Sequence, residues 1–168
     1  MTRSFPSALA TSRIVVKALI VLNLILGTLI AALLVASLIA RDQVFAALGA
    51  DVTNAGLIRG MRLIMVIGIG SVPLAHILLT RLLAIVDTVR FGDPFVSGNA
   101  ARLQTTAWAL LGLELLHLAV GVIAEESRPL DINWSFSISG WLAVLLLFVL
   151  ARVFEHGTRM RDDLEGTV

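Results

Sequence analysis

The chain has 168 residues, 58% of them apolar and 15% charged, and it contains no cysteine. A soluble domain has about 45–50% apolar and about 25% charged residues, so this composition is typical of a membrane protein and excludes a large soluble enzyme. The missing cysteines exclude a disulfide framework and a thiolate metal site, and 13 basic against 12 acidic residues exclude the strong positive field that direct nucleic-acid binding needs.

Four apolar stretches are long enough to cross a membrane, because about 20 helical residues span a hydrocarbon core of ~30 Å. They run from about Ala18 to Ala40, Leu63 to Val86, Leu103 to Ala124 and Ile132 to Phe154. Hydrocarbon cannot hydrogen-bond the backbone, so each stretch must be helical. We therefore predict an all-α fold, a single domain that is an integral membrane four-helix bundle with a short tail over residues 155–168.

The first apolar stretch follows Arg3, Arg13 and Lys17, a basic flank that secretory signal peptides also have. It is far longer than the ~7–15 apolar residues of a signal peptide, and Ala36 to Ala40 offers no good cleavage site. We expect it to be a retained helix.

Lys and Arg are distributed unevenly around the four stretches. With the N-terminus inside, nine lie on the cytoplasmic side and four on the outer side. Because cytoplasmic loops are enriched in Lys and Arg, both termini are predicted to be cytoplasmic. The inner set is Arg3, Arg13, Lys17, Arg81, Arg90, Arg102, Arg152, Arg159 and Arg161, and the outer set is Arg41, Arg59, Arg62 and Arg128.

The connecting segments differ in character. The first outer loop, Arg41 to Arg62, predicts a short amphipathic helix followed by a turn. On the inner side, Gly92 to Pro94 ends the second helix and starts a tight hairpin. The tail alternates basic and acidic residues, and is either a solvated helix end or a docking segment for a cytoplasmic partner.

Small residues four apart favour close helix contact in membranes. Gly27 with Ala31, and Ser71 with Ala75, form such pairs. They predict packing within the chain, and a homodimer face is the alternative.

The polar residues in the interior of the predicted spans that could carry chemistry are Asn23, His76, Glu114 and His117. Such residues are a functional hypothesis by default. Glu114 and His117 are three apart and share a helix face. Three interpretations stay open: a hydrogen-bond network that fixes helix register, a pair that handles protons or ions, and a metal site. The metal site lacks the second Glu-x-x-His that a di-metal bundle requires.

The two intramembrane histidines are predicted to lie about 10 Å apart along the membrane normal, too far to hold a haem between them. Hydrolase, phosphate-loop and metalloprotease motifs are absent from the sequence. We predict that the protein is not an enzyme and has no cofactor.

Two segments resemble a family of small bacterial inner-membrane proteins, the domain-of-unknown-function family 2975. They are RLLAIVDTVRFGDPFVSGNAARLQTTAW, from Arg81 to Trp108, and FSISGWLAVLLLFVLARVFEHGTRMRDDLEGTV, from Phe136 to Val168. The resemblance implies a four-helix protein of the bacterial inner membrane with cytoplasmic termini. Family members are often encoded beside a very small helix-turn-helix regulator, which implies a DNA-binding protein as partner. The family implies no activity, cofactor or catalytic residue.

Our leading hypothesis is a non-enzymatic membrane protein that binds a small regulator through its hairpin and tail, with sequestration of that regulator as one form of the hypothesis. The alternatives are a small proton- or ion-linked transporter using Glu114, His117 and His76, and a structural subunit of a larger complex. The candidate docking residues are Phe91, Asp93, Pro94, Phe95, Asn99 and Arg102 in the hairpin, and Arg159 and Arg161 in the tail.

Overall fold

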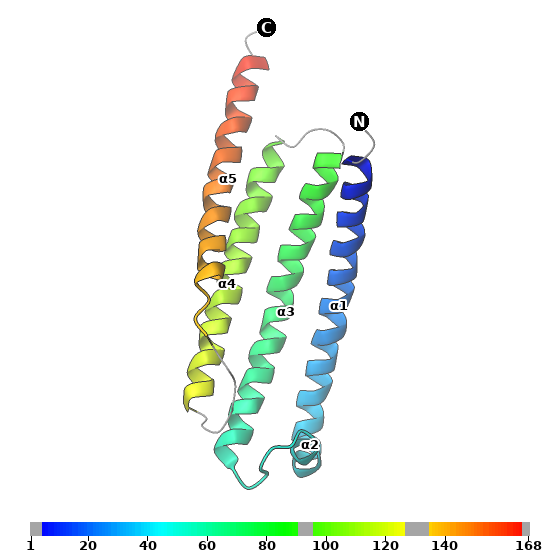
Figure 1. Ribbon diagram of the computed structural model, residues 1–168, viewed down its shortest axis with the longest axis vertical. Helices are drawn as coiled ribbons and strands as arrows, with labels where there is room; N and C mark the ends of the chain where they lie inside the picture. The colour runs from blue at the N-terminus through cyan, green and yellow to red at the C-terminus, as the bar shows by residue number, and fades with distance from the viewer. Residues whose placement is uncertain (1–4, 91–95, 127–134, 166–168) are drawn as a thin grey trace.

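The computed structural model describes residues 5–90, 96–126 and 135–165, which form five helices and no strand (Figure 1). Four of these helices contain a stretch long and apolar enough to cross a membrane. The predicted all-α, multi-pass membrane fold is therefore confirmed. The helices are α1 (Phe5–Ile39), α2 (Arg41–Ala47), α3 (Ala55–Arg90), α4 (Ser97–Glu126) and α5 (Ile138–Glu165).

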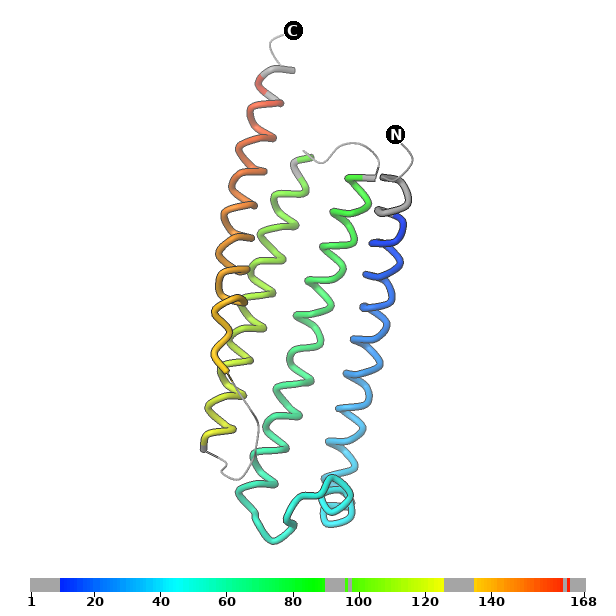
Figure 2. Tube along the Cα trace, in the orientation of Figure 1, coloured from blue at the N-terminus to red at the C-terminus, as the bar shows by residue number. Residues whose placement is uncertain are grey.

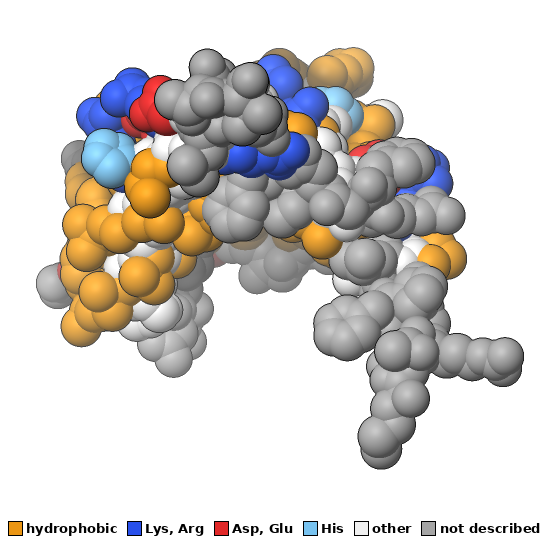
Figure 3. Space-filling view, turned by 90° about the horizontal axis from the view of Figure 1, so that it is seen from above, with side chains coloured by type: hydrophobic (Ala, Val, Ile, Leu, Met, Phe, Trp, Pro, Cys, Tyr) orange, Lys and Arg blue, Asp and Glu red, His pale blue; other side chains and the backbone are white. Residues whose placement is uncertain are grey.

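The four long helices stand in a row in chain order (Figures 1 and 2). α1 packs on α3, α3 on α4 and α4 on α5, and among the described residues no comparable interface joins α1 to α4 or α5. Both chain ends lie at one end of the row, which we call the terminal end (Figure 1). Charged and apolar side chains both reach the surface there (Figure 3).

Apolar side chains cover the outside of the row. Leu29, Val122 and Leu146 are 59%, 66% and 64% exposed, whereas small residues such as Ala107 fill the helix contacts. A soluble protein does not expose apolar surface on this scale. The surface fits a lipid solvent, in which small residues let helix backbones approach closely.

Glycine sets the spacing between α1 and α3. A Cβ atom on Gly27 would lie 2.7 Å from Cγ2 of Val72, closer than van der Waals contact allows. The prediction that Gly27 marks packing within the chain is confirmed.

The loop after α1 is anchored by Arg62. Its guanidinium donates to the carbonyl oxygen of Ser37, near the C-terminus of α1, and lies 5.6 Å from the centre of the Phe45 ring in α2. Ser37 and Phe45 are both fully buried. A cation at a helix C-terminus also complements the helix dipole. The predicted short helix is α2, which ends at a turn where Gly49 has a φ of 74°. The predicted turn lies further on, where Oδ1 of Asp51 accepts a hydrogen bond from the Thr53 N–H at 2.9 Å.

The fourth span begins later than the sequence predicted. α5 starts at Ile138 rather than near Ile132, and Ser135 to Ser137 are not helical. The side chain of Ser137 accepts a hydrogen bond from the Gly140 N–H at 3.1 Å, which is N-capping geometry. The local hydrogen bond fixes the helix start, whereas hydropathy reports only apolar content.

Contacts between helices fix their relative heights. Leu74 of α3 faces Gly112 of α4, and Thr88 accepts a hydrogen bond from Asn99 at 2.8 Å. In α3, Arg62 and Arg81 are separated by a rise of about 28 Å, close to a hydrocarbon thickness of ~30 Å. The helical rise, counted from the glycine contacts between neighbouring helices, places charged residues of the other helices near the same two levels. They are Lys17, Arg102 and Arg152 toward the terminal end, and Arg41 and Glu125 toward the opposite end.

Candidate functional site

α5 begins at mid-height of the row (Figure 1). Glu114 of α4 packs against Gly140 in the first turn of α5, in close contact with its backbone. Glu114 lies roughly 16 Å from the level of Glu125 near the end of α4. The N-terminus of α5 is therefore placed near the middle of the apolar slab, the zone between the charged levels that Arg62 and Arg81 mark. Non-helical Ser135 consequently lies at membrane depth. Non-helical backbone at this depth is tolerated only where protein or water satisfies it.

Glu114 is the least satisfied group at this point. Its Oε2 atom is buried and has no hydrogen-bond partner. Glu114 and His117 share a helix face, as predicted. In the described part of the chain, however, no hydrogen bond or ion pair joins their side chains. A helix N-terminus carries positive partial charge, which favours a carboxylate beside it.

His117 faces a different environment. Its Nε2 atom lies 3.3 Å from the carbonyl oxygen of Ser135, and its ring lines a cavity of about 240 Å³ between α3 and α4. Ser71 lines the same cavity and donates its hydroxyl to the carbonyl oxygen of Gly68 at 2.7 Å. The structure thus brings His117 near the start of α5 and near α3.

Asn23 and His76 belong to another part of the row. Asn23 of α1 donates its Nδ2 to the carbonyl oxygen of Val72, 3.1 Å away, just before Pro73 in α3. His76 follows Val72 by about one helical turn, and its Nδ1 atom is buried without a hydrogen-bond partner.

The four predicted intramembrane residues therefore do not converge on one site. With Gly112 opposite Leu74, the levels of His76 and His117 differ by roughly 10 Å, in agreement with the sequence estimate. Within the described ranges, no three His, Asp or Glu side chains come together as a metal site would require.

The hairpin residues Phe91, Asp93, Pro94 and Phe95 lie outside the described residues. Asn99 is fully buried: its amide donates to Thr88 at 2.8 Å, and its carbonyl oxygen accepts from Arg102 at 2.8 Å. Asn99 therefore joins the end of α3 to the start of α4, and in this structure its side chain is not at the surface. Arg102 is held in the same network.

The tail continues α5 as a helix as far as Glu165, past the terminal end of α4 (Figure 1). Glu155 accepts hydrogen bonds from Arg159 at 2.7 Å and from Arg152 at 3.2 Å. Arg159 is largely exposed, as is Arg161. Pairs three and four apart support an exposed helix, so the tail is an ordered helical extension.

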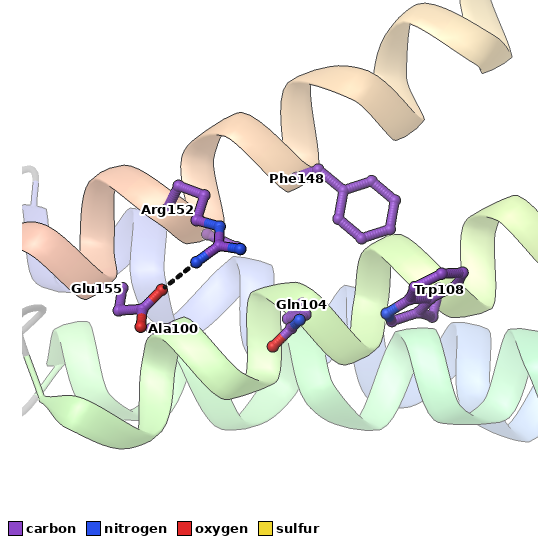
Figure 4. A pocket seen from close by; sticks show the side chains of 7 residues that line it. Ala100, Gln104, Trp108, Phe148, Arg152 and Glu155 are labelled. Carbon is purple, nitrogen blue, oxygen red and sulfur yellow. Dashed lines mark hydrogen bonds and ion pairs between the residues drawn. The ribbon is translucent and has the colours of Figure 1, made fainter.

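A cavity of about 560 Å³ lies between α4 and α5, near the terminal end (Figure 4). Gln104 and Trp108 line it from α4, and Phe148, Arg152 and Glu155 from α5. Sequence reasoning missed this cavity, because its residues come from two helices whose register no single sequence reveals. The one available signal was the arginine directly after the apolar run of α5.

Comparisons with protein-family models, with curated proteins and with solved structures gave no match. The class of the protein rests on its fold and composition: it is a multi-pass, all-helical membrane protein. The resemblance to family 2975 stays a prediction.

Proposed function

We propose that the protein is a non-enzymatic protein of the bacterial inner membrane that binds a cytoplasmic partner at its terminal end. The observation that carries the proposal is the extension of α5 beyond α4 (Figure 1). An isolated helix shorter than ~12–15 residues is marginal in water. The part of α5 that extends beyond α4 therefore needs support from the rest of α5 and from whatever it contacts.

The extension has surface features that suit a protein partner. Val153 and Met160 are 57% and 65% exposed, beside Arg159 and the half-buried Glu155. A groove of about 610 Å³ runs along this face of α5 and is lined by His156 and Met160 among others. Exposed apolar anchors with a charged rim fit a helix-in-groove contact. A small helix-turn-helix regulator is the partner that the family resemblance favours.

Site-specific photo-crosslinking in living cells tests this proposal. A photoreactive residue at Met160 should give one discrete adduct, identified by mass spectrometry as a small DNA-binding protein. The same residue at Val122, a lipid-facing position toward the opposite end, is the matched control and should give no such adduct. The Arg159→Glu variant should abolish the Met160 adduct, and Arg41→Glu should not. Identical adducts at both positions, or no protein adduct at Met160, would refute the proposal.

A second candidate function is proton or ion handling, and one observation favours it. The buried Oε2 atom of Glu114 lies without a hydrogen-bond partner against the first turn of α5, at mid-membrane depth. Intramembrane carboxylates at broken or short helices are typical of ion pathways. His76 lies on a different helix and at a different level, which supports Glu114 rather than the full predicted trio.

Flux through proteoliposomes tests this second candidate. The Glu114→Gln variant keeps the side-chain shape and removes the titratable group. Proton or cation flux that is present in the wild type and lost in this variant would establish ion handling. The His76→Gln variant is the matched control and should retain the flux. An absence of flux in the wild type would reject the candidate.

A further inference from the structure

The α4–α5 cavity changes from polar to apolar along its length (Figure 4). At the apolar end, the rings of Trp108 and Phe148 make an edge-to-face contact, with centroids 5.2 Å apart and planes at 84°. At the polar end, Arg152 and Glu155 approach each other over the start of α4. Gln104 lies between the two ends, so the cavity matches a molecule with a polar head and an apolar body.

The position of the cavity within the membrane agrees with this polarity. Arg152 lies near the charged level that Arg81 and Arg102 mark toward the terminal end. Trp108 follows Gln104 by one helical turn and so lies roughly 6 Å deeper in the apolar slab. A molecule filling the cavity would therefore hold its head at the membrane surface and its body beside acyl chains.

The charge at the polar end selects an anion. Glu155 is shared by Arg152 and Arg159, so the three side chains together carry one net positive charge. The Arg152 side chain is 81% exposed, and its hydrogen bonding to the described residues is a single Nη1–H donated to Glu155. A guanidinium has five donors in a planar fork that fits phosphate, so donors of Arg152 remain free for one.

We propose that this cavity binds an anionic phospholipid, with the phosphate at Arg152 and an acyl chain against Trp108 and Phe148. Basic pockets between transmembrane helices are known as sites for anionic headgroups. The ring pair supplies apolar area at the depth of the acyl chain, which a free phosphate ion could not use. The proposal does not depend on the partner protein proposed above, since its cavity lies between α4 and α5, but the two sites share Arg152 and Glu155, which also line the groove on α5.

Fluorescence quenching by brominated lipids measures the binding directly. The chain has three tryptophans. A variant of the full chain with Trp134→Phe and Trp141→Phe leaves Trp108 as the single reporter in the cavity. The protein is reconstituted in bilayers of phosphatidylcholine mixed with brominated phosphatidylglycerol or, separately, with brominated phosphatidylcholine. Preference for phosphatidylglycerol at Trp108 should be about fivefold, the equivalent of ~1 kcal/mol for one arginine near the surface.

Variants and controls separate a site from ordinary boundary lipid. Arg152→Gln should remove the headgroup preference, whereas Arg161→Gln, which deletes the same charge further along the same helix, should keep it. A reporter with Trp141 alone, at the start of α5, should show no preference and should be unaffected by Arg152→Gln, which also verifies folding of the variant.

Three results would overturn the proposal. Equal quenching of Trp108 by both brominated lipids would mean boundary lipid only. An unchanged preference in Arg152→Gln would place the headgroup elsewhere. Loss of the preference on adding inorganic phosphate at constant ionic strength would mean that the site takes a free phosphate ion, and we expect no such loss.

Discussion

Replacing Gly140 with alanine tests the register of α4 against α5. In the structure, a Cβ atom at this position would lie 2.8 Å from Oε2 of Glu114 and closer still to the rest of its carboxyl group. The carboxyl group must move, and no described residue offers it a hydrogen bond in its present place. We expect Gly140→Ala to destabilise the protein by about 1–3 kcal/mol, the usual cost of overpacking a tight contact.

The sign of the effect should reverse when Glu114 is removed. In a Glu114→Ala background the new methyl group meets no carboxyl group. Alanine is then favoured over glycine within a helix by about 0.5–1 kcal/mol. Gly140→Ala should therefore stabilise the Glu114→Ala protein slightly, and the difference between the two backgrounds gives a coupling energy of about 1.5–4 kcal/mol.

The measurement is a double-mutant cycle, with the free energy of unfolding of all four proteins taken from reversible denaturation in micelles and followed by circular dichroism. The Gly70→Ala substitution is the matched control, because a Cβ atom there would have nothing within 4 Å. Equal effects of Gly140→Ala in both backgrounds would refute the α4–α5 register, and with it the mid-membrane start of α5.

Three further predictions concern the α1–α3 side and the first loop. Gly27→Val should cost about 1–3 kcal/mol, because even a Cβ atom there lies 2.7 Å from Val72, and the loss should appear as a lower melting temperature. Arg62→Met should cost about 1–3 kcal/mol by leaving the buried Ser37 carbonyl unpaired, with faster hydrogen exchange at the end of α1 as the readout, and an unchanged exchange rate would contradict it. Hydrogen bonds from the Thr53 side chain and backbone lower the pKa of Asp51 from 3.8. The carboxylate therefore stabilises the turn above pH 3.8 and loses this effect as the pH falls through its lowered pKa, so Asp51→Asn should flatten the pH dependence of stability only in this acid range.

The sequence predicted the helices well where hydropathy decides them. Four long apolar stretches required four helices. The mixed apolar and polar segment after Arg41 predicted the short helix α2, and the turn formers from Asp51 predicted the turn at Asp51 and Thr53. The start of α5 was predicted too early, because Ile132 and Phe136 extend the apolar run, whereas Ser137 caps the helix through its own hydroxyl. The cap is a local hydrogen bond and leaves no trace in a hydropathy average.

The candidate sites were harder to predict than the spans. Helix-face reasoning placed Glu114 and His117 on one face, but the register between α4 and α5 decides that Glu114 meets Gly140. Asn99 was expected to face a partner, and instead it is buried between α3 and α4. Polar residues at helix ends satisfy backbone and side-chain groups of neighbouring helices as readily as they bind partners, and one sequence does not distinguish these uses.

The arrangement of the helices in a row has a consequence for biogenesis. Among the described residues, the extensive interfaces of each long helix are with the long helices next to it in the chain. During synthesis, therefore, each newly inserted long helix can pack at once on the long helix that was inserted before it. No interface depends on a helix that is inserted much later. Such local contacts close short loops and favour fast assembly. Truncated chains that end after α3 or after α4 should consequently hold the same α1–α3 interface as the full chain.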